Sequence, residues 1–203
     1  LIEDCVFMNT RGAPPEAGVD FEPFLPDQPM TGLVMRNCRI ENNAGAGVIS
    51  WSGASDGTSS DYSVTVENCL ITGNSGTTAA VALFGGACRL VNCTVASNAA
   101  TRTTGGVGGG YVVAVNSIIR ENAGKDGSVD SYLAASNSCV EADAVIGDAY
   151  RCTTERPRFD RNTPGREFVP RASALRGMAR IFPWMSDSAD PRCRDLAGRA
   201  RIT

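Results

Sequence analysis

A short motif recurs along this chain and constrains its fold more than any other feature. Each copy places a cysteine or serine after an asparagine, aspartate or serine, with apolar residues close by. The aligned third residues of the copies are Cys5, Cys38, Cys69, Cys93, Ser117 and Cys139. Their separations are 33, 31, 24, 24 and 22 residues, so the shorter values are one bare repeat and the first two include an insertion. A fixed period of this size predicts a stack of similar structural units.

Alternation within each copy predicts a β-strand. In the second copy, the small or apolar Cys38 and Ile40 alternate with the polar Asn37 and Arg39. Because side chains alternate between the faces of a strand, we expect the first pair to point inward and the second outward. The next copy would then lie on top, like on like, and bury a continuous core. We therefore predict an all-β parallel β-helix solenoid of about six coils.

A column of asparagines follows the motif five residues later, at Asn43, Asn74, Asn98 and Asn122. Asparagine tolerates the left-handed backbone of a sharp corner, and its amide can hydrogen-bond along a stack. We interpret the column as a structural ladder at the turns rather than a ligand site.

These patterns resemble the right-handed parallel β-helix repeat family of bacterial secreted and surface proteins. The C-terminal segment adds a second likeness, because residues 195–201 (Asp-Leu-Ala-Gly-Arg-Ala-Arg) are similar to a D-L-x-G-x-x-R motif that closes such proteins. Residues 180–190 depart from the short Gly/Asp-rich link of that family. The resemblance implies right-handed coils over residues 1–149, an irregular C-terminal cap over residues 150–203, and an extracellular or cell-surface location.

Composition excludes several classes of function. The chain has no histidine, which removes histidine-based acid–base chemistry and histidine-ligated metals. A net charge of −3 gives no basic surface for nucleic acid, and no apolar run is long enough to span a membrane. We expect no metal and no cofactor.

The eight cysteines contain no CxxC pair, which argues against zinc. Those in the motif are expected to form a buried column of small side chains. Cys88, Cys152 and Cys193 fall outside that column in this alignment. We predict a disulfide between Cys152 and Cys193 that would staple the cap in an oxidising compartment.

One group of residues could carry chemistry. Asp20 and Glu22 lie two residues apart in a segment that the repeat aligns with Gly47–Trp51, so both carboxylates should project outward with Trp51 one coil away. Two acids beside an indole suit a sugar-binding site, with Asp20 and Glu22 as catalytic candidates and Trp51 as the substrate platform. The insertions at 23–31 and 52–61 are expected to wall the cleft. Outward Asp-x-Glu pairs are also ordinary on a solvated strand.

Two functions remain open. The first is binding or processing of polysaccharide or a cell-surface glycan, with hydrolysis favoured over elimination because Lys125 is the only lysine and histidine is absent. Whether the protein is an enzyme at all stays open; if it is, we expect activity like that of a glycoside hydrolase. The second is a non-catalytic, adhesin-like or filament-forming surface protein that associates with itself, in which Asp20 and Glu22 are dispensable.

Overall fold

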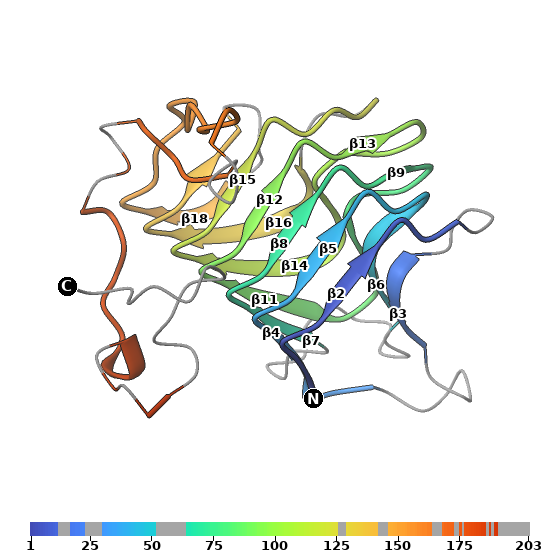
Figure 1. Cartoon of the computed structure of the whole chain (residues 1–203), viewed down its shortest axis with the longest axis horizontal. Helices are drawn as coiled ribbons and strands as arrows, with labels where there is room; N and C mark the ends of the chain where they lie inside the picture. Colours follow the sequence, from blue (N-terminus) through green and yellow to red (C-terminus); the bar gives the residue numbers. More distant parts are fainter. Residues whose placement is uncertain are drawn as a thin grey trace.

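The chain folds into a parallel β-helix (Figure 1). The computed structural model describes residues 1–11, 17–22, 30–51, 64–125, 129–141, 146–163, 168–172, 175, 177–185, 187 and 189–190. Every pairing between named strands is parallel. The predicted all-β solenoid is confirmed.

The strands form three columns, and each of the first five coils contributes to all three. The first column stacks β1 (Ile2–Glu3), β4 (Leu33–Arg36), β7 (Val64–Glu67), β11 (Ala87–Val91), β14 (Val107–Val115), β16 (Val129–Ser136) and β18 (Ile146–Tyr150). The second column stacks β2 (Val6–Met8), β5 (Arg39–Glu41), β8 (Leu70–Thr72), β12 (Thr94–Ala96), β15 (Ile118–Arg120) and β17 (Cys139–Val140). The third stacks β3 (Ala17–Phe21), β6 (Ala46–Trp51), β10 (Val81–Phe84) and the first residues of β14 and β16. Between the second and third columns lie the short β9 (Ser75–Gly76) and β13 (Ala99–Ala100), and the cap contains a 3-10 turn, η2 (Pro183–Met185).

Strand β14 belongs to two columns because it bends at two glycines. Its residues Val107 and Gly108 pair with β10, whereas its residues from Tyr111 onward pair with β11. Gly109 and Gly110 lie between these segments with φ of 72° and 58°. Glycine adopts this left-handed backbone without steric cost, so the chain turns the corner without leaving the sheet.

Stacking like on like produces the core. Ile40 pairs in register with Ile71, and both are fully buried, while Arg39 points outward and is exposed. The same inward column continues through Val95 and Ile119. The inward and outward assignment predicted from the alternation is confirmed.

The turn from the first to the second column uses a single left-handed residue in each coil. Five of these residues are asparagines with φ between 51° and 55°: Asn37, Asn68, Asn92, Asn116 and Asn137. Among non-glycine residues, asparagine is one of the few that occupies this region readily. The asparagine of the repeated motif is therefore the corner itself.

The second asparagine column lies inside the solenoid as a hydrogen-bonded ladder. Asn74 Oδ1 accepts bonds from Asn43 N (3.1 Å) and Asn43 Nδ2 (2.8 Å). Asn74 Nδ2 donates to Ile40 O and to Asn98 Oδ1, both at 3.0 Å. The predicted ladder is confirmed. The left-handed backbone expected for the asparagines of this ladder was wrong. The residue before each of them takes the positive φ instead, as Gly73 does before Asn74, at 67°.

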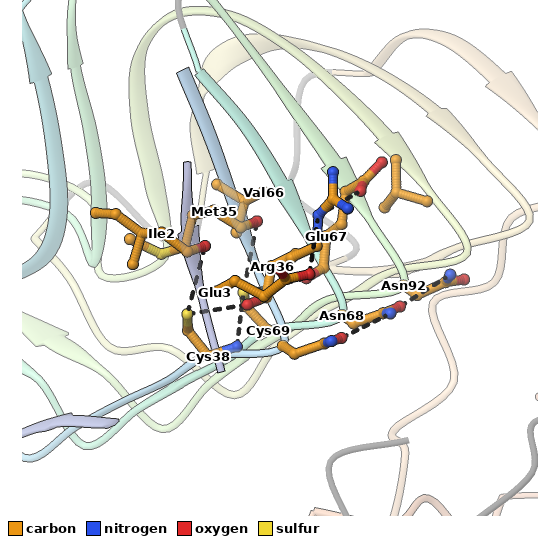
Figure 2. Close-up of polar contacts among 12 residues, drawn as sticks. Ile2, Glu3, Met35, Arg36, Cys38, Val66, Glu67, Asn68, Cys69 and Asn92 are labelled. Atoms are coloured by element: carbon orange, nitrogen blue, oxygen red, sulfur yellow. Dashed lines mark hydrogen bonds and ion pairs between the residues drawn. The ribbon is translucent and has the colours of Figure 1, made fainter. Parts of the chain in front are cut away.

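The motif cysteines form a buried column whose side chains accept backbone hydrogen bonds. Cys69 Sγ accepts a bond from Cys38 N at 3.4 Å (Figure 2), and Ser117 Oγ accepts one from Cys93 N at 3.2 Å. The slot therefore selects a small acceptor, which explains why both cysteine and serine are found in it. The sequence alone predicted only that this position needs a small side chain.

The last two members of this column differ from the expected ones. Cys139 pairs with Ile118, so Ser138, whose Oγ accepts a bond from Ser117 N at 3.0 Å, fills the slot. Cys139 lies on the opposite face of the strand, where its Sγ donates to Glu155 O at 3.2 Å. The next slot is filled by Cys152, because Arg151 takes the left-handed corner and Thr153 bridges to Cys139. Assigning Cys139 to the column was wrong by one residue of register, and placing Cys152 outside the column was also wrong.

A Cys69→Ser substitution should change the free energy of unfolding by less than about 1 kcal/mol, because serine already fills this slot elsewhere and makes the same bond. The matched Cys88→Ser substitution should cost about 1–3 kcal/mol, because Cys88 is fully buried among apolar side chains. Urea unfolding of both variants measures the difference. Equal losses would contradict the acceptor role of the column.

The described part of the cap packs through aromatic rings and arginine. Phe159 and Phe168 meet edge to face with centroids 5.4 Å apart, and the Arg161 guanidinium lies over both rings. Arg161 also donates to Ser97 Oγ (2.7 Å) and Glu121 Oε2 (2.8 Å), which ties the cap to two coils. The coil pattern continues through Thr153, and the division of the chain at residues 149 and 150 stays a prediction.

Candidate functional site

The candidate site lies on the outer face of the third column, where β3 pairs with β6. The register places Val19 beside Val48, Asp20 beside Ile49 and Phe21 beside Ser50. This is the alignment predicted from the repeat. The acidic segment and Trp51 therefore belong to neighbouring coils.

Strand alternation turns the two carboxylates outward. Val19 is buried, and Phe21 packs against the same core cluster, so Asp20 and Glu22 point to the opposite side, where both are exposed. Residues two apart on a strand are separated by about 6.5–7 Å at Cα. Partial burial, and secondarily the charge of Glu22, raise the pKa of Asp20. A carboxyl with a raised pKa is a candidate for the acid of an acid and base pair.

Trp51 lies against an aromatic ring of the next coil. Its ring stacks on Phe84 with centroids 4.0 Å apart and an interplanar angle of 9°. Each of these rings therefore has one face turned to the other ring and one face turned away. Trp51 Nε1 is buried and has no hydrogen-bond partner among the described residues. Phe84 was not predicted from the sequence, although the register of β10 on β6 places it beside Trp51.

The outer face beside the acids is apolar rather than charged. Ile49, Ala79 and Ala82 are buried and form a second hydrophobic cluster against Trp51, separate from the core of the solenoid. Strands β3, β6 and β10 carry no lysine or arginine. Among the described residues of the third column in the first three coils, only Asp20 and Glu22 are charged. Glu22 lies just past the end of β3.

A second aromatic pair lies on the first column. Tyr111 and Tyr132 stack with centroids 5.1 Å apart and an interplanar angle of 18°, and Tyr132 is exposed. Their pairing follows from the register of β14 and β16. Aromatic side chains are thus stacked along the solenoid at two separate positions.

Several predicted features involve residues outside the described part of the chain. Residues 23–29 and 52–61, expected to wall the cleft, belong to this group, so the cleft stays a prediction. Cys193 also belongs to it. Cys152 is half-buried and packs against the core, and its disulfide with Cys193 stays a prediction.

Comparison with known proteins adds no relative. No family model matches the chain, and no curated protein or solved structure is significantly similar to it. Within the described ranges, no helix has the length and apolar character needed to cross a bilayer, and no three metal-ligating side chains cluster.

Proposed function

We propose that this protein is a secreted or cell-surface β-helix that binds polysaccharide along the outer face of β3, β6 and β10. The observation that carries the proposal is the position of Asp20 on β3, and of Glu22 just past its end, beside the strand that carries Trp51 of the Trp51–Phe84 stack. Sugars are bound by carboxylates that accept hydroxyl hydrogen bonds and by rings that cover the apolar face of a pyranose. In this proposal the protein belongs to the right-handed β-helix repeat family of bacterial surface proteins.

Hydrolysis is the reaction that this pair of acids suits. Asp20, with its raised pKa, would donate a proton to the glycosidic oxygen, and Glu22 would act as the base or nucleophile. Elimination from an acidic sugar is less well supported, because it commonly uses a lysine, arginine or histidine base and this column offers none. The absence of positive charge also favours a neutral glycan over a polyanionic one.

A structural role is the second candidate, and the stacked rings favour it. Trp51 and Phe84 turn one ring face toward each other, and Tyr111 and Tyr132 do the same. Such pairs stabilise neighbouring strands without any ligand. A surface or filament protein built on these coils would keep its function without Asp20 and Glu22.

The two candidates separate on the acidic pair. In the Asp20→Asn/Glu22→Gln variant, glycan affinity or the rate of turnover should fall at least about tenfold. A glycan array measures the binding, and release of reducing sugar measures the turnover. Turnover by the wild type should fall as the pH rises through the raised pKa of Asp20, because the proton donor is then lost.

The matched control is Asp4→Asn. It removes one exposed carboxylate and places at the first corner the residue that later corners carry. Binding and turnover should be unchanged in this control. Unchanged glycan binding and turnover in the Asp20/Glu22 variant would end the catalytic proposal and leave the structural role.

A further inference from the structure

The outer face of the first column carries partly exposed side chains over five consecutive coils. In β11 the core residues Cys88 and Leu90 are buried, so Arg89 between them points outward, where it is half-buried. The register of the parallel strands places one such residue in each of the five coils: Val34, Thr65, Arg89, Val113 and Ala134. Because each of them is partly accessible, solvent reaches this face over the length of five coils.

A pair of tyrosines stands beside this row of residues. Tyr111 pairs in register with Tyr132, and each lies two residues before the member of the row on its own strand, so both rings are on the same outer face. Tyr132 is 49% exposed, and its ring stacks on that of Tyr111. A half-exposed tyrosine ring offers an apolar surface to the face of a pyranose, and its hydroxyl can bond to a sugar hydroxyl.

Arg89 is a cation of this face that has no anionic partner among the described residues. Nearer the N-terminus, Arg36 lies between Glu3 and Glu67, with its Nε 3.6 and 3.7 Å from their carboxylates (Figure 2). The ion pairs within the described part of the chain all involve arginines other than Arg89. A planar guanidinium binds a carboxylate through two parallel hydrogen bonds. Arg89 is therefore suited to hold an anionic group of a ligand.

The cation and the tyrosine pair are close enough to meet one ligand. Arg89 lies one coil and two residues away from Tyr111, and two coils away from Tyr132. With strands about 4.8 Å apart and about 6.5–7 Å between alternate residues, the Cα of Arg89 is about 8 Å from that of Tyr111 and about 12 Å from that of Tyr132. Between them lie only the short side chains of Val113 and Ala134. This separation is comparable with the length of a disaccharide.

The docked segment of the cap lies at the other end of these strands. Asn116 Nδ2 donates to Arg180 O at 2.8 Å, and Asn137 Nδ2 donates to Met178 O at 2.6 Å. Each of these corner asparagines comes five residues after the tyrosine of its own strand, which is about 16 Å along the strand. These contacts of the cap therefore do not reach the tyrosine pair.

The chemistry of this face favours a saccharide over a peptide. Strand β11 pairs with β7 and β14, and β14 pairs with β11 and β16, so both edges of these strands are already used. No backbone edge is left on them to bind an extended peptide as an added strand. A saccharide needs no such edge, because its hydroxyl and carboxylate groups and the apolar faces of its rings make the contacts.

We propose that Arg89, Tyr111 and Tyr132 bind an oligosaccharide that contains uronic acid. The Arg89 guanidinium pairs with a carboxylate of one sugar, and the ring of Tyr132 packs against the face of another. This site lies on the first column and takes an acidic glycan, whereas the site at Asp20 and Glu22 lies on the third column and suits a neutral one. Neither site depends on the other.

The probe for this face is a tetrasaccharide of β-1,4-linked glucuronic acid, titrated into the full chain by isothermal calorimetry. Binding should be saturable and should weaken as salt is raised, because a charge pair contributes to it. Cellotetraose, which has a hydroxymethyl group in place of each carboxylate, should bind at least about tenfold more weakly. The Arg89→Gln variant should bind the acidic probe at least about tenfold more weakly than the wild type. The matched control Arg102→Gln removes an exposed arginine outside the strands of this face and should leave binding unchanged.

The Asp20→Asn/Glu22→Gln variant separates this site from the one on the third column, and it should bind the acidic tetrasaccharide as the wild type does. The proposal is overturned by absence of saturable binding, by equal binding of cellotetraose, or by unchanged binding in Arg89→Gln. Loss of binding in the Asp20/Glu22 variant also overturns it, because the acidic sugar would then occupy the third column. Tetraglutamate is the last probe: if it binds more tightly than the sugar and loses affinity in Arg89→Gln, the face binds an acidic peptide instead.

Discussion

Replacing Asn74 by alanine is expected to lower the free energy of unfolding by about 3–5 kcal/mol. The Asn74 amide takes part in four hydrogen bonds, and its side chain is almost fully buried. Each bond contributes about 1 kcal/mol net, and alanine would leave Asn43 N buried without this partner, whereas Asn98 Oδ1 would keep only its bonds from backbone N–H groups such as Asn74 N. Equilibrium unfolding in urea, followed by circular dichroism, measures the loss.

The matched control is Asn92→Gly, in the ladder of corner asparagines, where Asn92 Nδ2 donates to Asn68 Oδ1 at 3.2 Å and Asn92 Oδ1 accepts a bond from Asn116 Nδ2 at 3.0 Å. Asn92 is only partly buried, and glycine keeps the left-handed corner, so the expected loss is below about 1.5 kcal/mol. Similar losses for both variants would show that the two ladders contribute equally and that burial is not what makes the inner one important.

Gly109→Ala is expected to cost about 2–5 kcal/mol or to prevent folding. Gly109 has φ of 72°, and a Cβ built there would lie 2.0 Å from the backbone oxygen of Leu83. Left-handed backbone costs an alanine about 1–2 kcal/mol, and the clash with a fixed carbonyl adds a further 1–3 kcal/mol. The strand β14 would have to leave β10 to relieve it.

Gly32→Ala isolates the backbone part of this effect. Gly32 has φ of 70°, but no atom of the described residues lies within 4 Å of the position of its Cβ. Its expected loss is therefore only about 1–2 kcal/mol in the same urea measurement. A loss at Gly32 as large as at Gly109 would mean that the left-handed conformation alone, and not close packing of the coils, fixes the bend in β14.

Much of the site followed from the repeat, and one part did not. Counting from the repeat placed Asp20 beside Ile49 and turned it outward, because the register of parallel coils is carried by sequence spacing. The same count missed Phe84, which stacks on Trp51, because the coil that contains it lacks the Gly-Val pattern of its neighbours.

The error at Cys139 has a different origin. Spacing alone allowed Cys139 to follow Ser117 in the column, but the corner is set by the residue that takes the positive φ, which is Asn137. Ser138 then occupies the slot and Cys139 turns to the opposite face. A one-residue change in register exchanges the two faces of a strand, so a repeat count that is off by one moves a side chain from one face to the other.

By itself, the sequence determined the parallel β-helix, the inward and outward faces of its strands and the stacking of Asn43 on Asn74. These depend on local alternation and on a period repeated along the chain, which the amino-acid order carries directly. Only the tertiary structure decided that Trp51 meets Phe84, that Ile49 is buried on the outer face and that residues 177–180 dock on the corner asparagines. What covers an outward side chain depends on segments distant in the chain, and no local pattern encodes such contacts.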